Sequence, residues 1–297
     1  MPTSAFHFMF YVYAIGSMLA YALQQTLLVR QARTMDGFSL AFYRNISFLV
    51  TLSPLLIGAS TEDLLKTAVE WQTILFSAVA GGLSMALTFG AYRFLSVSFS
   101  GALSAAIATL ITAALGCVLF SEQLSLFGIV FLALTLLGVL ILGFHYKHLP
   151  HLDSTFALGL LMALGGGIFT ALSKFAVTVL SRETSPFISG YVWEGSIGIA
   201  CAILLVLRFW ITGKSLHRVS VKECMSITLY SSPTLLGTGF FCLAISTGPV
   251  AIVSAIGTSG LVVMTLLAWI WYGESLDRKQ LLGMALILFG IVGLRFV

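Results

Sequence analysis

Ten long apolar runs, separated by short polar stretches, make up most of this 297-residue chain. A helix needs about 20 mostly apolar residues to cross a bilayer. Runs of that order lie at 8–29, 38–58, 72–94, 98–120, 125–144, 155–178, 187–209, 223–246, 249–272 and 279–296. The strands of a membrane barrel would alternate over about ten residues instead. The pattern therefore predicts an all-α membrane protein with ten transmembrane helices.

The composition excludes several classes of protein. Hydrophobic residues make up 59% of the chain and charged residues 9%, whereas soluble domains carry about 25% charged residues. A water-soluble enzyme is therefore excluded, and ten spans leave only short connections. The net charge is +4, but the basic residues are scattered between apolar runs and form no stripe that could follow a phosphate backbone. Nucleic acid is not an expected partner.

No metal, disulfide or cofactor is expected from the sequence. The cysteines lie in or beside apolar segments without CxxC spacing, which is typical of small buried hydrophobic residues; they are Cys117, Cys201, Cys224 and Cys242. Three histidines at i, i+3 and i+6 suggest a metal site, but their polar surroundings favour a solvated connection; they are His145, His148 and His151.

The chain contains an internal repeat, seen when residues 1–145 are laid over residues 155–297. LFSEQLSLFGIVFLALTLLGVLIL in the first half matches WYGESLDRKQLLGMALILFGIVGL in the second, so that Glu122 corresponds to Glu274. Each unit holds five spans, and an odd number forces the second unit to enter the membrane in the opposite sense. The sequence therefore predicts two inverted five-helix repeats, an arrangement found in many secondary transporters.

Three features together carry a family resemblance. They are the 5+5 span pattern, the segment Phe42-Tyr43-Arg44 inside the second span, and an F/Y-x-E-x-L signature that closes spans four and nine at 120–124 and 272–276. In these features the chain resembles the EamA-type carriers of the drug/metabolite transporter superfamily. The resemblance covers nearly the whole chain.

The resemblance implies a basket of helices around a central cavity that carries small organic solutes. Spans one to four and six to nine would line the cavity, and spans five and ten would be peripheral. One departure concerns the proline that the family often places about thirteen residues before each paired glutamate, where this chain has Thr109 and Leu261. A helix break in spans four and nine is thus not predicted, although Gly257 and Gly260 can soften span nine.

Charged residues inside a bilayer cost about 2.5 to 3.5 kcal/mol each on insertion scales and are candidate functional residues. Three lie clearly within the spans: Arg44, Lys174 and Glu194. The guanidinium of Arg44 can bind a substrate carboxylate or phosphate through a bidentate fork. The alternative is a side chain that reaches out to the membrane surface.

Glu194 aligns with Arg44 in the repeat, so the two halves carry opposite charges at equivalent positions. Such charges can bind the two ends of a zwitterion, or act as gate contacts if inversion places them toward opposite faces. Lys174, whose counterpart is Gln25, flanks a short loop with Glu194, and the two can form an ion pair. Glu194 is the candidate for proton coupling, and uncoupled exchange is equally compatible with the sequence. Glu122 and Glu274 are expected to cap the helices that follow them.

Polar and aromatic residues near these charges complete the candidate substrate-binding set. Besides Arg44, Lys174 and Glu194, it comprises Gln25, Tyr43, Tyr92, Ser104, Thr109 and Trp193. The string Gly257-Thr258-Ser259-Gly260 resembles a membrane serine protease motif, but every histidine lies in a loop or near the N-terminus, so no base is available for the serine.

The sequence is best explained by a secondary transporter in the cell membrane, inner or plasma, that works by alternating access. Its substrate is expected to be a small polar metabolite, such as an amino acid, a nucleotide-linked compound or a similar zwitterion or anion. The bilayer, and a proton or a counter-substrate, are its further expected partners. The alternatives are a membrane-embedded enzyme and a non-transporting channel or scaffold.

Basic residues in the connections predict the orientation of the chain. Connections after odd-numbered spans hold Arg30, Arg33, Arg93, Lys147, Arg208, Lys214, Arg218, Lys222, Arg278 and Lys279. The opposite side holds Lys66, Arg182 and Arg295. This bias places both termini outside the cytoplasm, whereas the resemblance implies cytoplasmic termini. We take the charge bias as the prediction.

Overall fold

The computed structural model describes residues 4–92, 94–95, 97–143, 154–273 and 276–294, and within them every regular element is helical. The first half contains α1 (Ser4–Thr34), α2 (Gly37–Thr51), the 3-10 turn η1 (Ser53–Leu56), α3 (Thr61–Val69), α4 (Trp71–Ala91), α5 (Val97–Leu119) and α6 (Leu126–Gly143). The second half contains α7 (Ser154–Glu183), α8 (Pro186–Thr212), α9 (Val221–Ser231), α10 (Thr234–Thr247), α11 (Val250–Thr258), α12 (Gly260–Tyr272) and α13 (Arg278–Leu294).

Eight stretches of this part of the chain are long and apolar enough to cross a membrane. Two of them combine consecutive helices, α9 with α10 and α11 with α12. The predicted spans at 38–58 and 279–296 do not reach the length of the others, because α2 has 15 residues and α13 has 17. The multi-pass helical architecture is therefore confirmed, but ten full-length spans are not.

The second predicted span ends early. Pro54 is the second residue of η1, and proline fits in the first turn of a helix because it lacks an N–H that the turn leaves unpaired. The polar stretch at 60–66, between the predicted spans 38–58 and 72–94, is expected to be a loop; this is wrong, since Thr61–Val69 forms α3. Ser60 caps that helix, accepting a hydrogen bond from the Asp63 backbone N–H at 3.0 Å. A capping residue three positions before an acid signals a helix start, and the prediction overlooked it.

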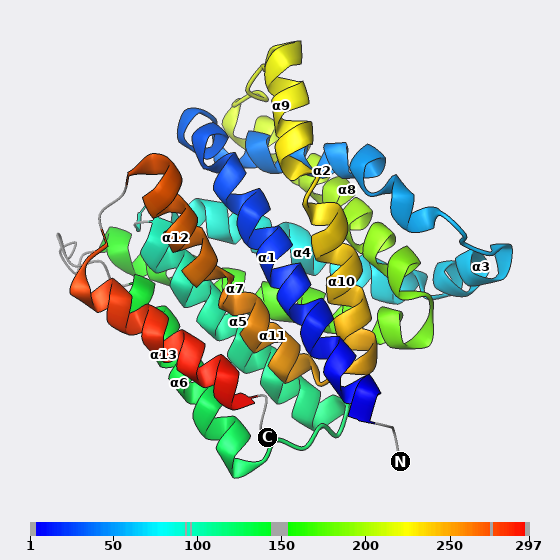
Figure 1. Cartoon of the computed structure of the whole chain (residues 1–297). Helices are drawn as coiled ribbons and strands as arrows, with labels where there is room; N and C mark the ends of the chain where they lie inside the picture. Colours follow the sequence, from blue (N-terminus) through cyan, green and yellow to red (C-terminus); the bar gives the residue numbers. More distant parts are fainter. Residues whose placement is uncertain (1–3, 93, 96, 144–153, 274–275, 295–297) are drawn as a thin grey trace.

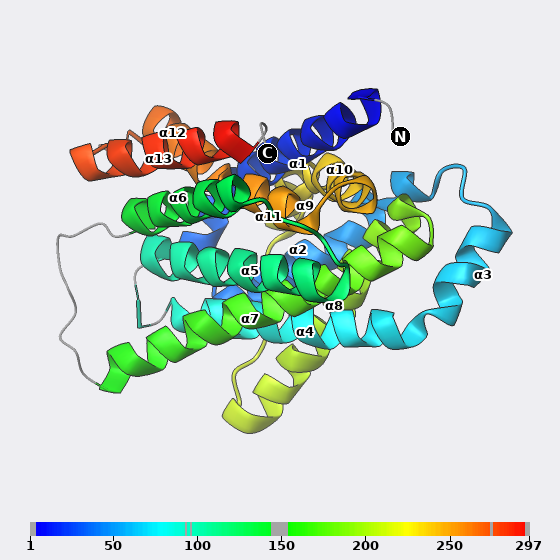
Figure 2. The ribbon, with the colours of Figure 1, turned by 90° about the horizontal axis from the view of Figure 1, so that it is seen from below.

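Helix α3 projects from the rest of the bundle (Figures 1 and 2). It presents the exposed apolar side chains Leu64, Leu65 and Val69 beside the charged pair Glu62 and Lys66. An amphipathic helix of this kind suits the membrane surface.

Two of the predicted spans are broken, and the fourth is continuous. Helix α5 runs without interruption through Thr109, the position at which the family often has proline. The ninth span is interrupted at Ser259, between α11 and α12 and beside the glycines expected to soften it. The eighth predicted span is interrupted at Pro233, between α9 and α10.

Helices α6 and α13 lie side by side at one edge of the bundle (Figures 1 and 2). Their backbones approach closely at glycines: a Cβ added to Gly138 would lie 2.7 Å from the carbonyl oxygen of Gly283. Small residues allow such contacts in membranes, where helices associate through close packing. The pairing lies at the edge, as the resemblance implies for spans five and ten, although one end of each helix also reaches the central cavity.

Large apolar side chains cover much of the outer surface, whereas small residues are common inside. Val118, Trp210 and Ile211 are each more than three quarters exposed, as expected for side chains that contact lipid. Alanines and serines such as Ala163, Ala171 and Ser189 are fully buried. This distribution is opposite to that of a soluble domain and agrees with a bundle surrounded by hydrocarbon.

The same backbone turn closes equivalent helices in the two halves. Ser121 and Gly273 follow α5 and α12, and both adopt left-handed φ angles, of 53° and 66°. These positions correspond in the sequence repeat, each one residue before a paired glutamate. Glycine adopts this conformation freely, while serine does so at a cost. The repeat is thus visible in backbone conformation as well as in sequence.

Candidate functional site

A cavity of about 590 Å³ lies between the helices of both halves. Its walls come from α1, α4, α5 and α6 of the first half and from α7, α11, α12 and α13 of the second. It is lined by Met18, Tyr21, Ala22, Gln25, Thr26, Val29, Thr88, Tyr92, Gly101, Ala102, Ser104, Ala105, Ala108, Leu142, Gly143, Thr170, Lys174, Gly257, Thr258, Gly260, Leu261, Met264, Thr265, Ala268, Tyr272 and Gln280.

The cavity extends from the middle of the bundle to one of its ends. Tyr92 caps the end of α4, Gly143 and Tyr272 end α6 and α12, and Gln280 lies in the first turn of α13. These helix ends share the side of the molecule that holds the connection from α1 to α2. We call this side the mouth end.

The other end of the bundle, which we call the sealed end, is closed by contacts between the two halves. Arg182, near the end of α7, donates hydrogen bonds to the carbonyl oxygens of Ile245 and Gly248, both at 3.0 Å. Its guanidinium also contacts Glu122, and its carbon Cζ lies 4.1 Å from the centre of the Phe120 ring.

Glu122 does not cap the following helix α6, so that prediction is wrong. Its Oε1 atom accepts a hydrogen bond from the backbone N–H of Val250, the first residue of α11 in the other repeat, at 3.0 Å. A carboxylate suits a helix N-terminus because the first N–H groups have no partner within the helix. Helix α6 is capped by Ser125 instead, which accepts from the Gly128 N–H at 3.1 Å. Glu274, its counterpart, lies outside the described residues.

Lys174 is the one Lys, Arg, Asp or Glu among the described residues that line the cavity. It is half-buried, and its Nζ atom donates to the hydroxyl of Ser254 at 3.4 Å. The same atom lies 5.9 Å from the centre of the Phe241 ring. Both neighbours are uncharged, so the ammonium faces the cavity without a negative partner among these contacts.

Glu194 lies behind the cavity wall. Its side chain is 4% exposed, and its Oε1 atom accepts from the hydroxyls of Thr238 at 3.2 Å and Tyr21 at 3.4 Å. The Tyr21 and Thr238 hydroxyl oxygens also lie 2.7 Å apart; because each hydroxyl has one proton, the two can donate only two of these three hydrogen bonds at a time. Tyr21 lines the cavity, so it connects the cavity surface to the buried carboxylate.

The structure has no ion pair between Lys174 and Glu194, both of which it describes. The predicted pair does not form because Lys174 turns toward Ser254 on α11, while Glu194 is held by residues of α1 and α10. Adjacency across a short loop was the basis for that prediction. The outcome depends on which neighbouring helix each side chain faces, and loop length does not specify this.

Arg44 lies on α2, outside the set of cavity-lining residues. Its guanidinium carbon is 4.8 Å from the centre of the Phe48 ring one helical turn away, and its charge acts electrostatically on Glu194. The two helices pack closely here, since a Cβ on Gly198 of α8 would lie 3.3 Å from the Cβ of Asn45. The two charges that align in the repeat therefore lie on helices that pack against each other.

Four of the nine predicted substrate-binding residues line the cavity: Gln25, Tyr92, Ser104 and Lys174. Thr109 does not line the cavity but is buried behind Thr258, which does, and the two hydroxyl oxygens lie 2.6 Å apart.

The remaining two aromatic candidates face elsewhere. The Trp193 indole N–H donates to the Ser173 hydroxyl at 2.9 Å, and its ring stacks on Phe241. The Tyr43 hydroxyl donates to the carbonyl of His217 in the connection after α8, at 3.1 Å.

The sequence analysis did not identify several of the lining residues, although the helical spacing of the positions on α1 indicates them. On α1, the lining positions Met18, Tyr21, Ala22, Gln25 and Val29 follow the 3.6-residue helical period. Gln25 was a predicted site residue, and Tyr21 lies one turn before it on the same face. Extending the face by one turn would have identified Tyr21.

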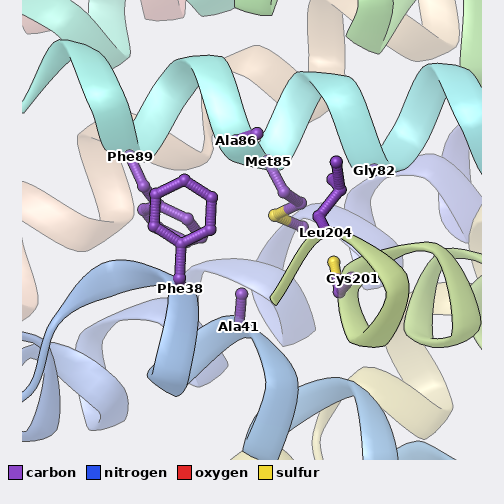
Figure 3. A pocket seen from close by; sticks show the side chains of 8 residues that line it. All are labelled: Phe38, Ala41, Gly82, Met85, Ala86, Phe89, Cys201 and Leu204. Atoms are coloured by element: carbon purple, nitrogen blue, oxygen red, sulfur yellow. The ribbon is translucent and has the colours of Figure 1, made fainter. Parts of the chain in front are cut away.

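A second hollow lies between α2, α4 and α8 (Figure 3) and has a volume of about 10 Å³. Its lining is apolar and comprises Phe38, Ala41, Gly82, Met85, Ala86, Phe89, Cys201 and Leu204. A cavity of this size holds one water molecule at most, and a bound water needs two or more polar partners. The hollow is a packing defect. The candidate metal-binding histidines His145, His148 and His151 lie outside the described residues.

The comparisons with known proteins agree with this architecture. The sequence profile of the EamA-like transporter family matches residues 8–144 and, a second time, residues 157–296. A solved structure described only as the crystal structure of a protein superposes with a TM-score of 0.75, over 98% of this chain and 96% of its own. The two sequences are 16% identical, so this likeness shows the fold alone. A comparison with curated proteins found no match.

Proposed function

Because the chain belongs to the EamA-like transporter family of the drug/metabolite transporter superfamily, we propose that it is a secondary carrier working by alternating access. Its two inverted repeats, 1–145 and 155–297, move a small polar metabolite across the cell membrane, inner or plasma. An amino acid, a nucleotide-linked compound and a similar zwitterion or anion are the substrate classes considered. Ligand binding and transport, without chemical conversion of the solute, are its activity.

The observation that carries this proposal is the cavity of about 590 Å³, which is lined by both repeats and reaches the mouth end of the bundle. Its volume falls within the roughly 300–1,000 Å³ of small-molecule sites. A carrier in one of its two access states needs such a cavity together with a barrier at the opposite end. Arg182 and Glu122 supply contacts of that barrier.

Transport by reconstituted protein tests the proposal. The purified chain is first screened against a metabolite panel for thermal stabilisation, since a ligand that binds only the folded state raises the apparent stability. Ligands that stabilise it are then used in counterflow with proteoliposomes. Ala105→Trp fills the cavity and should abolish counterflow. Ala114→Trp makes the same change on the exposed face of α5 and should preserve it. Protein that moves no solute yet modifies lipid or peptide would displace the proposal.

The orientation follows from the charge bias and can be tested separately. Arg208 at the end of α8 pairs with Asp36 in the connection between α1 and α2, so these basic connections share the mouth end. We therefore expect the cavity to face the cytoplasm and Ser215→Cys to resist an impermeant thiol reagent in intact cells. Rapid labelling of that cysteine would reverse the orientation.

A further inference from the structure

In the part of the chain that the structure describes, the cavity surface carries one positive charge and no negative group. Among the described lining residues, only Lys174 has a side chain that is charged at neutral pH. Glu194 is almost fully buried behind Tyr21, and Arg44 lies outside the lining. Among the residues that the structure describes, a solute in the cavity therefore meets one ammonium group and no carboxylate.

An ammonium group on a cavity wall is stabilised by an anionic partner and by hydrogen bonds to each of its protons. The contacts of Lys174 within the protein are one long hydrogen bond to Ser254 and a distant ring face. These neighbours leave most of its hydrogen-bonding capacity facing the cavity, because an ammonium group has three donors. A bound anion would supply the missing charge.

The hydroxyl groups beside Lys174 indicate the kind of molecule that carries this anion. Ser104 donates its proton to the Ala163 carbonyl at 2.8 Å, and Thr170 donates to the Gly166 carbonyl at 2.8 Å. Thr258 donates to the Ser254 carbonyl at 3.0 Å. A hydroxyl has one proton and two lone pairs. Thr170 and Thr258 also contact the hydroxyls of Ser84 and Thr109, which leaves each of them one lone pair that can accept a further hydrogen bond. They suit a solute that bears hydroxyl donors of its own.

We infer that the substrate of this cavity is a small hydroxylated monocarboxylate, whose carboxylate binds Lys174 and whose hydroxyl groups face Ser104, Thr170 and Thr258. This inference rests on the proposed function and narrows it. A zwitterion would bring an ammonium group into a cavity whose described lining already holds one and offers no acid. A phosphate monoester carries a charge of about −1.5 to −2 at neutral pH, more than one lysine neutralises.

Thermal stabilisation of the purified carrier by matched solutes tests the inference. The probes are gluconate as the anion, glucose as the neutral compound, glucosamine as the cation, serine as the zwitterion and 6-phosphogluconate as the phosphate ester. Gluconate should stabilise the protein most. Stabilisation by glucose, glucosamine or serine equal to that by gluconate would overturn the inference, and so would stronger stabilisation by 6-phosphogluconate.

Variants of Lys174 identify the group responsible. Lys174→Met should weaken gluconate binding about tenfold or more, because hydrogen bonds to charged groups are the strong ones, while Lys174→Arg retains part of it. Lys66→Met removes an exposed lysine far from the cavity and should leave binding unchanged. Wild-type gluconate affinity in a folded Lys174→Met protein would contradict the assignment. Folding is checked by gel filtration and by the unliganded melting temperature.

Two further measurements separate other outcomes. Anionic phospholipid added to the detergent micelles tests whether a lipid headgroup occupies the cavity; competition with gluconate that Lys174→Met abolishes would assign the site to lipid and overturn the solute assignment. Counterflow of gluconate in proteoliposomes separates the two proposals. Binding without transport would overturn the carrier function and leave the assignment of the anion standing. Transport of neutral solutes but not of gluconate would support the carrier function and overturn the assignment of the anion.

Discussion

Arg182 and Glu122 join the two halves of the molecule at the sealed end, with the Nη2 atom of Arg182 2.7 Å from the Oε1 atom of Glu122. The Glu122 side chain is only 10% exposed and that of Arg182 is 25% exposed. Both groups make further hydrogen bonds, to the backbone of α10, of the α10–α11 connection and of α11. The pair therefore ties the end of α7 and the turn after α5 to the start of α11.

Removing one partner of this pair should destabilise the protein strongly. Glu122→Gln keeps an oxygen for the Val250 N–H but leaves the Arg182 guanidinium without its charge partner, and Arg182→Met leaves the carboxylate unpaired. Breaking a buried pair in this way costs about 3 kcal/mol, which thermal unfolding in detergent would detect. The double variant should recover part of the loss.

The exposed pair Lys66 and Glu62 is the matched control. Its atoms lie 2.7 Å apart, as in the sealed-end pair, but its side chains are 57% and 75% exposed. Neutralising either residue should change stability by less than about 0.5 kcal/mol. Equal losses for the two pairs would show that burial does not govern the contribution of the Arg182 pair.

The close backbone contact between α6 and α13 predicts that alanine substitutions at two glycines have opposite effects on stability. Gly138→Ala would place a methyl group 2.7 Å from the carbonyl oxygen of Gly283 and 2.8 Å from the backbone N of Ile287. The helices must separate, at a cost of about 1–3 kcal/mol. Gly195→Ala on α8 meets only Leu49 at 3.8 Å and should gain up to about 1 kcal/mol from helix propensity. A melting temperature for Gly138→Ala at or above that of Gly195→Ala would refute the contact.

The α-helical class and the repeat could be predicted because both depend on patterns along the chain. The direction in which each buried charged side chain points could not be predicted. Lys174 and Glu194 have the same signature in the sequence, a charge within an apolar run, yet the first lines the cavity and the second is enclosed by Tyr21 and Thr238. The difference depends on which helices pack against α7 and α8, and hydrophobic periodicity specifies a buried face without naming its neighbour. The shortness of α2 was hidden by an apolar run that continues into η1 and beyond.

Asp36 gives a prediction for the pH dependence of stability at the mouth end. Partial burial alone would raise the pKa of this carboxyl. Hydrogen bonds from the Ser39 hydroxyl, from Arg208 and from the Ser39 backbone N–H outweigh it, so the pKa of Asp36 lies below its usual value. A depressed folded-state pKa stabilises the fold above the unfolded-state pKa of about 3.9, and this stabilisation is lost as pH falls through the folded-state value.

Asp36→Ala should therefore destabilise the protein at neutral pH, by about 1 kcal/mol for the lost helix cap alone. The difference from wild type should stay constant between about pH 8 and 5 and shrink below about pH 4. Asp36→Asn keeps an oxygen acceptor for the Ser39 N–H without a titrating charge, so it separates the cap from the charge. Melting temperatures across this pH range provide the measurement, and a difference that persists unchanged at acid pH would contradict the assignment.

The separate surroundings of Lys174 and Glu194 predict how their substitutions combine. Because each side chain has its own partners, the stability losses of Lys174→Met and Glu194→Gln should add in the double variant to within about 0.5 kcal/mol. Transport should not recover. If Glu194 couples transport to protons, Glu194→Gln alone removes the pH dependence of uptake, and Tyr21→Phe shifts the pH profile because it removes a hydrogen bond to the carboxylate. Tyr191→Phe, on the same helix as Glu194 but bonded to the Leu49 carbonyl, is the control and should leave that profile unchanged. A double variant that transports at the wild-type rate with the wild-type pH response would exclude a direct role for Glu194.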